Sequence, residues 1–275
     1  MTAWNYPPDV HLLADLGVEI DADEERTAAR IPVTPELLGP DGGVHAGVIA
    51  TLVDIVGGVI AVRVLHPDWM ATADMSLQVV RPATGPVLEA QGTVVRHGRT
   101  TLVLEVFVFD VPDDGEPVAW STLTFAVLPR AADAPEPDDL PGLPRRSVFG
   151  PAQLAVHVLE AVSIADAGGA EGMTMPVGDY VRNTIGGLQG GVVALFAEVA
   201  GARAVAAALG TGRPSVAVEL QVSYIALGRV GPMVARVRSV TADPTTGSGR
   251  GVVELRDAGA DDRLTTVVAV GAVSA

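Results

Sequence analysis

Two long apolar stretches stand out along the chain, and each is followed by shorter runs rich in Val, Leu and Thr. The long stretches, at about 45–65 and 189–209, have the length and continuity of helices. The shorter runs are bounded by Pro, Gly and Asp, which is typical of strands joined by turns. An extended opening is expected as far as Leu38; strands are expected at 71–80, 87–96, 100–110 and 117–128 after the first helix, and at 214–225, 232–241, 250–256 and 263–271 after the second.

The second series of elements repeats the first. The phrase "GGVHAGVIATLVD" that opens the first helix recurs as "GGLQGGVVALFAE" at the start of the second. His45 and Gln189 are 144 positions apart, and so are Asp54 and Glu198. An internal repeat of this size indicates duplication of one folding unit.

A proline-rich, acidic stretch separates the two halves. Residues 129–146, "PRAADAPEPDDLPGLPRR", contain five prolines and four acidic residues and follow neither a helical nor a strand period. We therefore expect an N-terminal unit at 1–128, a linker at 129–150 and a C-terminal unit at 151–275. Each unit would be an α+β fold, one helix with an antiparallel sheet, and two such units can cover each other's exposed edges.

The composition first suggests a membrane protein, with 48% hydrophobic residues and a mean hydropathy of +0.37. However, the first apolar stretch contains Asp54 and Arg63, which are costly in lipid. The opening "MTAWNYPPDV" also lacks the basic and apolar regions of a signal peptide. We therefore expect a cytoplasmic protein without a membrane partner. The chain has no cysteine, which excludes disulfides, thiol catalysis and cysteine-bound zinc, and no cofactor or metal is expected.

The charge balance argues against nucleic acid as a partner. The formal net charge is −15, from 33 acidic and 18 basic residues, and aromatic residues make up only 4%. An anionic ligand would therefore need a local cluster of arginines. The candidates are Arg81, Arg96 and Arg99 in the first half and Arg229, Arg238 and Arg250 in the second, although each could equally be a solvated strand residue.

One carboxylate lies inside each apolar helix, Asp54 in the first and Glu198 in the second, among small residues. A carboxylate in an apolar setting costs stability unless it is paired or solvated. A matched pair of such acids indicates a cleft that holds water and a ligand. The alternative is that the small residues allow close helix packing while each acid reaches solvent or a helix cap.

Each helix begins with a polar residue followed by small ones, His45-Ala46-Gly47 and Gln189-Gly190-Gly191. The N–H groups in the first turn of a helix lack intrahelical partners and carry the positive end of the dipole. Small side chains let a ligand carbonyl approach those donors. A glycine-rich loop that merely enters a helix is the alternative reading.

This arrangement, a polar residue, small residues and an acid nine positions after the polar one, resembles the hotdog-fold acyl-CoA thioesterases. It is most similar to the phenylacetate-pathway and 4-hydroxybenzoyl-CoA thioesterase group. The resemblance implies a tandem double hotdog, in which each helix is wrapped by its sheet and the active sites lie between paired units. One unit would offer an oxyanion donor and an amide, and the other a carboxylate and a hydroxyl. It also implies an acyl-CoA substrate and a homo-oligomer of double hotdogs.

Transferred to this chain, the resemblance predicts two unequal clefts. Asp54 is followed eighteen residues later by Thr72, whereas Glu198 is followed on the matching strand by Ala217, allowing one inserted residue. The first cleft would be complete and would hydrolyse the thioester, with the Gly190 N–H polarising the carbonyl and Asp54 acting as general base or nucleophile. The first cleft collects Asp54, Thr72, Asn183, Gln189 and Gly190; the second, depleted cleft collects Gly39, His45, Ala46, Glu198 and Ala217.

Coenzyme A carries phosphates, so the resemblance also calls for basic residues near the cleft mouth. We favour Arg99 and Arg250, because each follows a glycine in what looks like a repeated turn, "HGRTTLVLEV" and "SGRGVVELRD"; Arg81 is a third candidate. Apolar residues on the helices could line an acyl tunnel or fill the core: Val56, Val59, Leu195, Phe196 and Val199.

Two other functions stay open at the level of sequence. His45 with Glu198 would suit a hotdog hydratase or dehydratase, although the "GDxNPxH" phrase of hydratases is absent. The depletion of one cleft would also suit a non-catalytic acyl-CoA-binding module.

Overall fold

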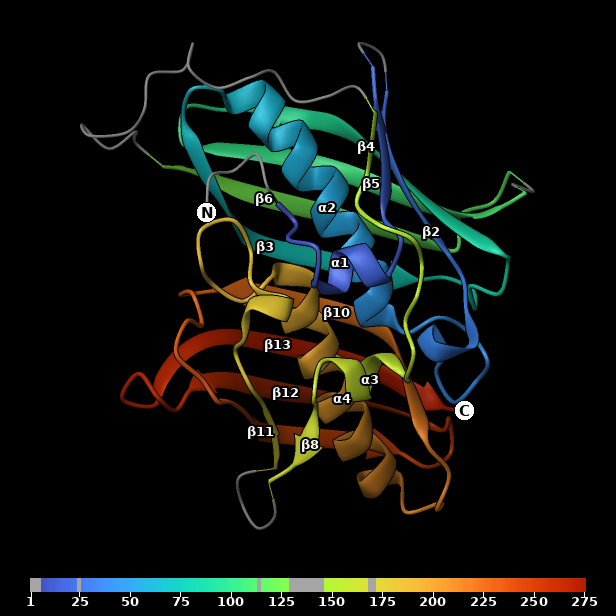
Figure 1. Ribbon diagram of the computed structural model, residues 1–275. Helices are drawn as coiled ribbons and strands as arrows, with labels where there is room; N and C mark the ends of the chain where they lie inside the picture. The colour runs from blue at the N-terminus through green and yellow to red at the C-terminus, as the bar shows by residue number, and fades with distance from the viewer. Residues whose placement is uncertain (1–5, 24–25, 113–114, 129–145, 168–171) are drawn as a thin grey trace.

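The computed structural model describes residues 6–23, 26–112, 115–128, 146–167 and 172–275. Two long helices lie on one face of a continuous antiparallel sheet (Figure 1). The first half contains α1 (Leu12–Asp15), β1 (Glu19–Ala22), β2 (Thr27–Pro32), a 3-10 turn (Pro35–Leu37), α2 (Ala46–Leu65), β3 (Trp69–Val79), β4 (Val87–His97), β5 (Thr101–Val111) and β6 (Ala119–Leu128). The second contains β7 (Arg146–Val148), α3 (Val158–Ala161), β8 (Ala165–Asp166), β9 (Met173–Met175), a 3-10 turn (Asp179–Val181), α4 (Gly190–Leu209), β10 (Ser215–Tyr224), β11 (Met233–Asp243), β12 (Ser248–Asp257) and β13 (Arg263–Ser274).

The expected duplication is visible in the order of the strands. The order across the described sheet is β7-β1-β2-β4-β5-β6-β3-β10-β13-β12-β11-β9-β8, and each half repeats the same arrangement about the centre. The halves join where β3 pairs with β10, with Met75 opposite Val222. Each half thereby covers one edge of the other's sheet, which is the double hotdog that the sequence predicts.

The sequence missed the short elements at the edges of the sheet. Both long helices and the eight long strands lie within a few residues of their expected positions, and β1 and β2 lie in the extended opening, whereas α1, α3, β7, β8 and β9 were not expected. Residues 146–148 of the expected linker form β7, in which Val148 pairs with Glu19 of β1. Residues 129–145 of that linker lie outside the described residues.

The two long helices form the core. By length and composition alone both could cross a membrane, with mean hydropathies of 2.2 for α2 and 1.8 for α4. In the fold, 61% and 67% of their most apolar segments are buried. A helix that is apolar on every face suits a position wrapped by a sheet and crossed by a second helix, so the core accounts for this hydropathy.

The two helices cross at a pair of equivalent glycines. A Cβ at Gly47 would overlap the backbone of Leu195, and a Cβ at Gly191 would overlap the backbone of Thr51. The absence of side chains at these two positions therefore sets the distance between α2 and α4. This close approach brings the start of each helix against the middle of the other.

Two equivalent histidines join the halves in a reciprocal way. His11 accepts a hydrogen bond from Leu13 N at the start of α1, and its other ring nitrogen lies 2.9 Å from the carbonyl oxygen of Arg182. His157 does the same at α3, where its Nε2 lies 3.1 Å from the carbonyl oxygen of Leu38. Each short helix is thus tied to the loop that precedes the long helix of the opposite half.

The crossing predicts a clear difference between two glycine substitutions. Gly191→Ala should lower the free energy of unfolding by about 2 kcal/mol or more, because the added methyl group meets backbone that cannot yield easily. Gly58, also on a long helix, has open space where a Cβ would lie. Gly58→Ala should therefore raise the free energy of unfolding by roughly 0.5–1 kcal/mol. Urea unfolding of both variants measures the contrast, and equal effects would contradict the proposed packing.

Candidate active site

The first cleft forms around the carboxylate of Asp54. Its Oδ1 accepts a hydrogen bond of 3.0 Å from the Thr72 hydroxyl on β3, and its Oδ2 accepts one of 2.9 Å from Gln189 Nε2. A Cβ at Gly190 would lie 2.8 Å from Oδ2, so the carboxylate rests against the N-terminus of α4. An acid from one half therefore meets an amide and a helix start from the other.

Gln189 is held at both ends of its amide group. Its Oε1 caps α4 by accepting a hydrogen bond of 3.0 Å from Val192 N, and its Nε2 donates to Asp54. Capping by the oxygen leaves the amide nitrogen to face the opposite half. The side chain is only 4% exposed, which restricts it to this arrangement.

The setting of Asp54 changes its acidity. Burial raises the pKa of Asp54 from 3.8 to about 6, while hydrogen bonds from Thr72 and from the N–H groups of Gly191 and Gly190 limit the rise. A carboxyl group with a pKa near 6 is a stronger base than an ordinary aspartate and is still ionised at neutral pH.

Asn183 shapes the loop before α4 and makes no hydrogen bond to Asp54. Its Oδ1 accepts from the N–H groups of Ile185 and Gly187, and its Nδ2 donates to the carbonyl oxygen of Leu188 at 3.3 Å. Of the five residues expected in the first cleft, four therefore meet one another directly. The fifth supports the loop that leads into them.

Two tyrosines near Asp54 were missed by the sequence analysis. Tyr224, at the end of β10, donates a hydrogen bond of 2.9 Å to the carbonyl oxygen of Gly190. Burial and the charge of Asp54 raise the pKa of Tyr224, and the same two causes raise that of Tyr6. No local sequence signal marks either residue, because their proximity to Asp54 depends on contacts between distant segments.

The second cleft contains a buried acid–histidine pair. His45 Nδ1 lies 2.9 Å from Glu198 Oε1, and Gly47 N donates to Oε2 at 2.7 Å. Burial lowers the pKa of His45, but the charge of Glu198, its hydrogen bond and the charge of Asp41 outweigh this and leave the pKa raised. The raised pKa favours a charged His45 beside Glu198, whereas Asp54 has only uncharged hydrogen-bond partners.

His157 was also missed and adds an aromatic contact to the second cleft. Its ring meets that of His45 edge-on, with centroids 5.6 Å apart. The residue comes from the segment at α3, so the second cleft is closed by the C-terminal half's short helix.

The strand positions that distinguish the two clefts are equivalent in the structure. Thr72 immediately precedes a β-bulge in β3, and Ala217 immediately precedes one in β10. Thr72 and Ala217 therefore occupy matching places beside the bulges, as the comparison with one inserted residue expects. The hydroxyl of the first cleft is replaced by a methyl group in the second.

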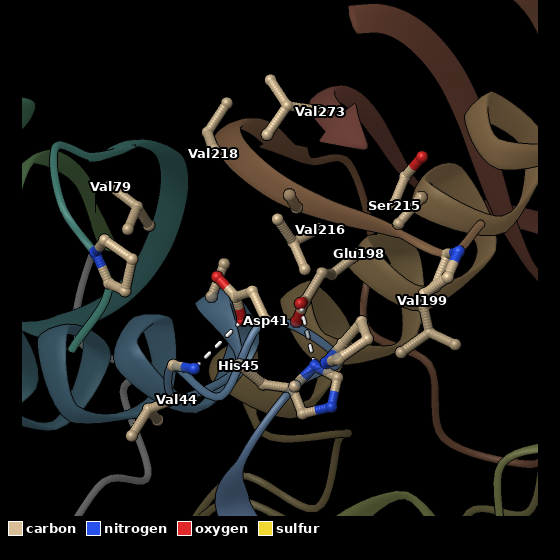
Figure 2. A pocket seen from close by; sticks show the side chains of 18 of the residues that line it. Asp41, Val44, His45, Val79, Glu198, Val199, Ser215, Val216, Val218 and Val273 are labelled. Atoms are coloured by element: carbon tan, nitrogen blue, oxygen red, sulfur yellow. Dashed lines mark hydrogen bonds and ion pairs between the residues drawn. The ribbon is translucent and has the colours of Figure 1, made fainter. Parts of the chain in front are cut away.

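A cavity of about 380 Å³ opens beside the second cleft. Figure 2 shows His45 and Glu198 directed toward each other at one side, with valines of both halves around them. Gly39 and Ala46, the other expected members of the second cleft, also line it. The apolar lining includes Val79, Val199, Val216, Ala217, Val218 and Val273.

The three arginines favoured for coenzyme A do not share one environment. Arg99 is exposed in the turn between β4 and β5, whereas Arg250 lies within β12, where it forms an ion pair of 2.5 Å with Glu219. The two Gly-Arg pairs are therefore not equivalent turns, and that part of the sequence interpretation is wrong. Arg81 pairs with Asp110 at 3.3 Å and lines the cavity at the second cleft.

The apolar helix residues named as possible tunnel walls divide between core and cavity. Val56 and Phe196 are fully buried and Leu195 is 1% exposed, so these three fill the core. Val199 lines the cavity at the second cleft. Within the described ranges, no group of three or more His, Asp or Glu side chains could hold a metal ion.

Comparison with known proteins gives consistent results for both halves. The model of the Thioesterase superfamily matches residues 41–116 and 186–256, which include α2 and α4. A Halobacterium salinarum protein named "Putative esterase" is 40% identical over 123 residues, covering 41% of this chain and 80% of that protein.

Solved structures match nearly the whole chain. A "putative thioesterase" from Novosphingobium aromaticivorans covers 93% of this chain and 98% of its own, with a TM-score of 0.60 and 21% identity. A protein described as having a hot dog fold, from Alicyclobacillus acidocaldarius, covers 96% and 98% with a TM-score of 0.59 and 16% identity. These two likenesses establish the fold alone.

The raised pKa of Asp54 predicts how stability depends on pH. Because the pKa of Asp54 is about 6 in the folded state and 3.8 for an ordinary aspartate, ionisation of this carboxylate disfavours the folded state. The stabilisation of the folded state by protonated Asp54 is therefore fully present below about pH 4. It is lost as the pH rises through 6, which lowers the free energy of unfolding by roughly 3 kcal/mol. Asp54→Asn should be more stable than the wild type at pH 7.5, with little difference at pH 4. Urea unfolding at both pH values measures this, and parallel pH dependences would contradict it.

Proposed function

The chain belongs to the thioesterase superfamily, whose family model spans parts of both halves, and we propose that it hydrolyses acyl-CoA thioesters at the first cleft. One observation carries the proposal: the Asp54 carboxylate lies 2.9 Å from the side chain of Gln189, which caps α4 of the other half. A base of raised pKa and a set of oxyanion donors thus meet at one point. Acyl-CoA as the substrate, and the phenylacetate and 4-hydroxybenzoyl-CoA group as the nearest subgroup, rest on the sequence resemblance.

The donors at the start of α4 suit the developing oxyanion. The Gly190 N–H and the Gln189 amide both donate hydrogen bonds to Asp54. A thioester carbonyl that accepts one of these hydrogen bonds instead would leave one carboxylate oxygen without that partner. Hydrogen-bond donors placed at such an oxygen are each worth about 3 kcal/mol of barrier lowering. Tyr224 donates to the carbonyl oxygen of Gly190, in the peptide that carries the Gly191 N–H, and so holds the helix start in place.

Asp54 would act in one of two ways. As a general base it takes a proton from water while the water oxygen attacks the carbonyl carbon, and the C–S bond then breaks as the proton passes to the coenzyme A thiolate. As a nucleophile it forms a mixed anhydride and expels the thiolate, and water then hydrolyses the anhydride. Both routes give a carboxylic acid and coenzyme A. Thr72, at 3.0 Å, would hold the carboxylate in position in either case.

Matched substitutions of the two helix acids test this assignment. Asp54→Asn should lower kcat/KM for acyl-CoA by at least about 100-fold, because it removes the base but keeps the shape of the side chain. Glu198→Gln makes the equivalent change in the second cleft and should alter kcat/KM by less than about threefold. Turnover is followed by thiol release, with unfolding curves as a control for folding. Equal losses from the two variants would refute the assignment to the first cleft.

The pH dependence of turnover gives a second test of the same base. Because Asp54 must be ionised to accept a proton, kcat/KM should rise with pH about a midpoint near 6 and level off above it. Thr72→Val removes a hydrogen bond that lowers the pKa and should move the midpoint upward, whereas Thr72→Ser should not. A midpoint pH that is the same in Thr72→Val as in the wild type would contradict the role of Asp54.

Parallel assays distinguish the alternatives raised by the sequence. A hydratase would consume the double bond of crotonyl-CoA without releasing thiol, and a binding module would retain acyl-CoA without any turnover. We expect thiol release, because His45 and the Gly47 N–H already occupy both oxygens of Glu198, the acid that a hydratase would use.

A further inference from the structure

The two clefts occupy equivalent places in the repeat but differ in the size of their side chains. Val79 ends β3 seven residues after Thr72, and Tyr224 ends β10 seven residues after Ala217. The first cleft therefore has Thr72 and Tyr224 where the second has Ala217 and Val79. At these matched positions the second cleft consistently has the smaller residue.

The cavity at the second cleft lies against these two smaller residues. Val79 and Ala217 both line it, and they are the positions at which larger side chains fill the first cleft. Its volume of about 380 Å³ lies within the range of about 300–1000 Å³ for small-molecule pockets. An unfilled apolar cavity costs stability, so a ligand that fills it with apolar atoms would gain binding energy there.

The polar groups of the cavity indicate what the head of such a ligand would be. Ser215 is only 7% exposed, and its hydroxyl has no hydrogen-bond partner in the part of the chain that is described. A buried hydroxyl without a partner is unfavourable, and a ligand carbonyl would satisfy it. The arginines of the wall, Arg81 and Arg203, pair with Asp110 and Asp166, so the cavity does not demand an anion.

The carboxylate of this cleft is poorly suited to catalysis. Glu198 gives one oxygen to His45 and the other to Gly47 N, and the hydroxyl that supports Asp54 in the first cleft is replaced by Ala217. A histidine and a backbone N–H thus hold Glu198 where an amide and a hydroxyl hold Asp54.

We infer that the cavity beside His45 and Glu198 is a second ligand site, which binds the acyl chain and neutral carbonyl of an acyl thioester without hydrolysing it. The inference does not depend on turnover at Asp54. It makes the protein a two-site molecule, with one cleft that acts on a thioester and one that retains it.

A single substitution can fill this site with a side chain that the fold already accommodates elsewhere. Val79→Tyr copies Tyr224 at the equivalent position, where the tyrosine hydroxyl donates to the carbonyl oxygen of Gly190 at the start of the long helix of its own half. The probe is a ketone analogue of octanoyl-CoA, with CH₂ in place of sulfur so that no cleft can hydrolyse it. Isothermal titration calorimetry gives the number of sites per chain. We expect two sites in the wild type and one in Val79→Tyr.

The control is Val94→Tyr, the same substitution on an exposed strand position outside the cavity, which should keep both sites. One wild-type site that Val79→Tyr abolishes would support this inference while contradicting binding at Asp54. A site count that Val79→Tyr leaves unchanged would overturn the inference and leave the proposed hydrolysis intact. No binding to the wild type would contradict both.

Discussion

The close crossing of α2 and α4 is the constraint on which the rest of the structure depends. Gly47 and Gly191 allow the helix backbones to meet, and this contact places each helix start beside the acid of the other helix. In isolation each acid would be a charge buried in an apolar helix, which is costly. The duplication offsets this unfavourable burial, because each half supplies hydrogen-bond donors to the carboxylate of the other half.

The two clefts occupy equivalent places in the repeat and differ in what surrounds the acid. Uncharged donors and a hydroxyl meet Asp54, so burial dominates and its pKa rises. A histidine meets Glu198, so the charge is paired. The first cleft holds a carboxylate of raised pKa at a cost in folding stability. The second holds a carboxylate that is hydrogen-bonded to a histidine beside a cavity. Under the two proposals, divergence between the copies separates hydrolysis at the first cleft from ligand binding at the second.

The sequence predicted the parts of this architecture that repeat and failed where they depend on contacts between distant segments. Helices and long strands follow from continuous apolar patterns, and the meeting of Asp54 with Gln189 was expected from the family resemblance carried onto the repeat. Tyr224 and His157 carry no comparable signal, because only the pairing of the halves brings them to the clefts. The Gly-Arg comparison failed because similar letters lie in a turn in one half and within a strand in the other.

Membership of the thioesterase superfamily and the geometry of the first cleft lead to the same chemistry from independent directions. The most direct test is a crystal structure with the ketone analogue of an acyl-CoA bound. The account predicts the analogue's carbonyl oxygen within about 3 Å of the Gly190 N–H, with the Asp54 carboxylate facing the carbonyl carbon. A carbonyl group remote from both Asp54 and the start of α4 would contradict it.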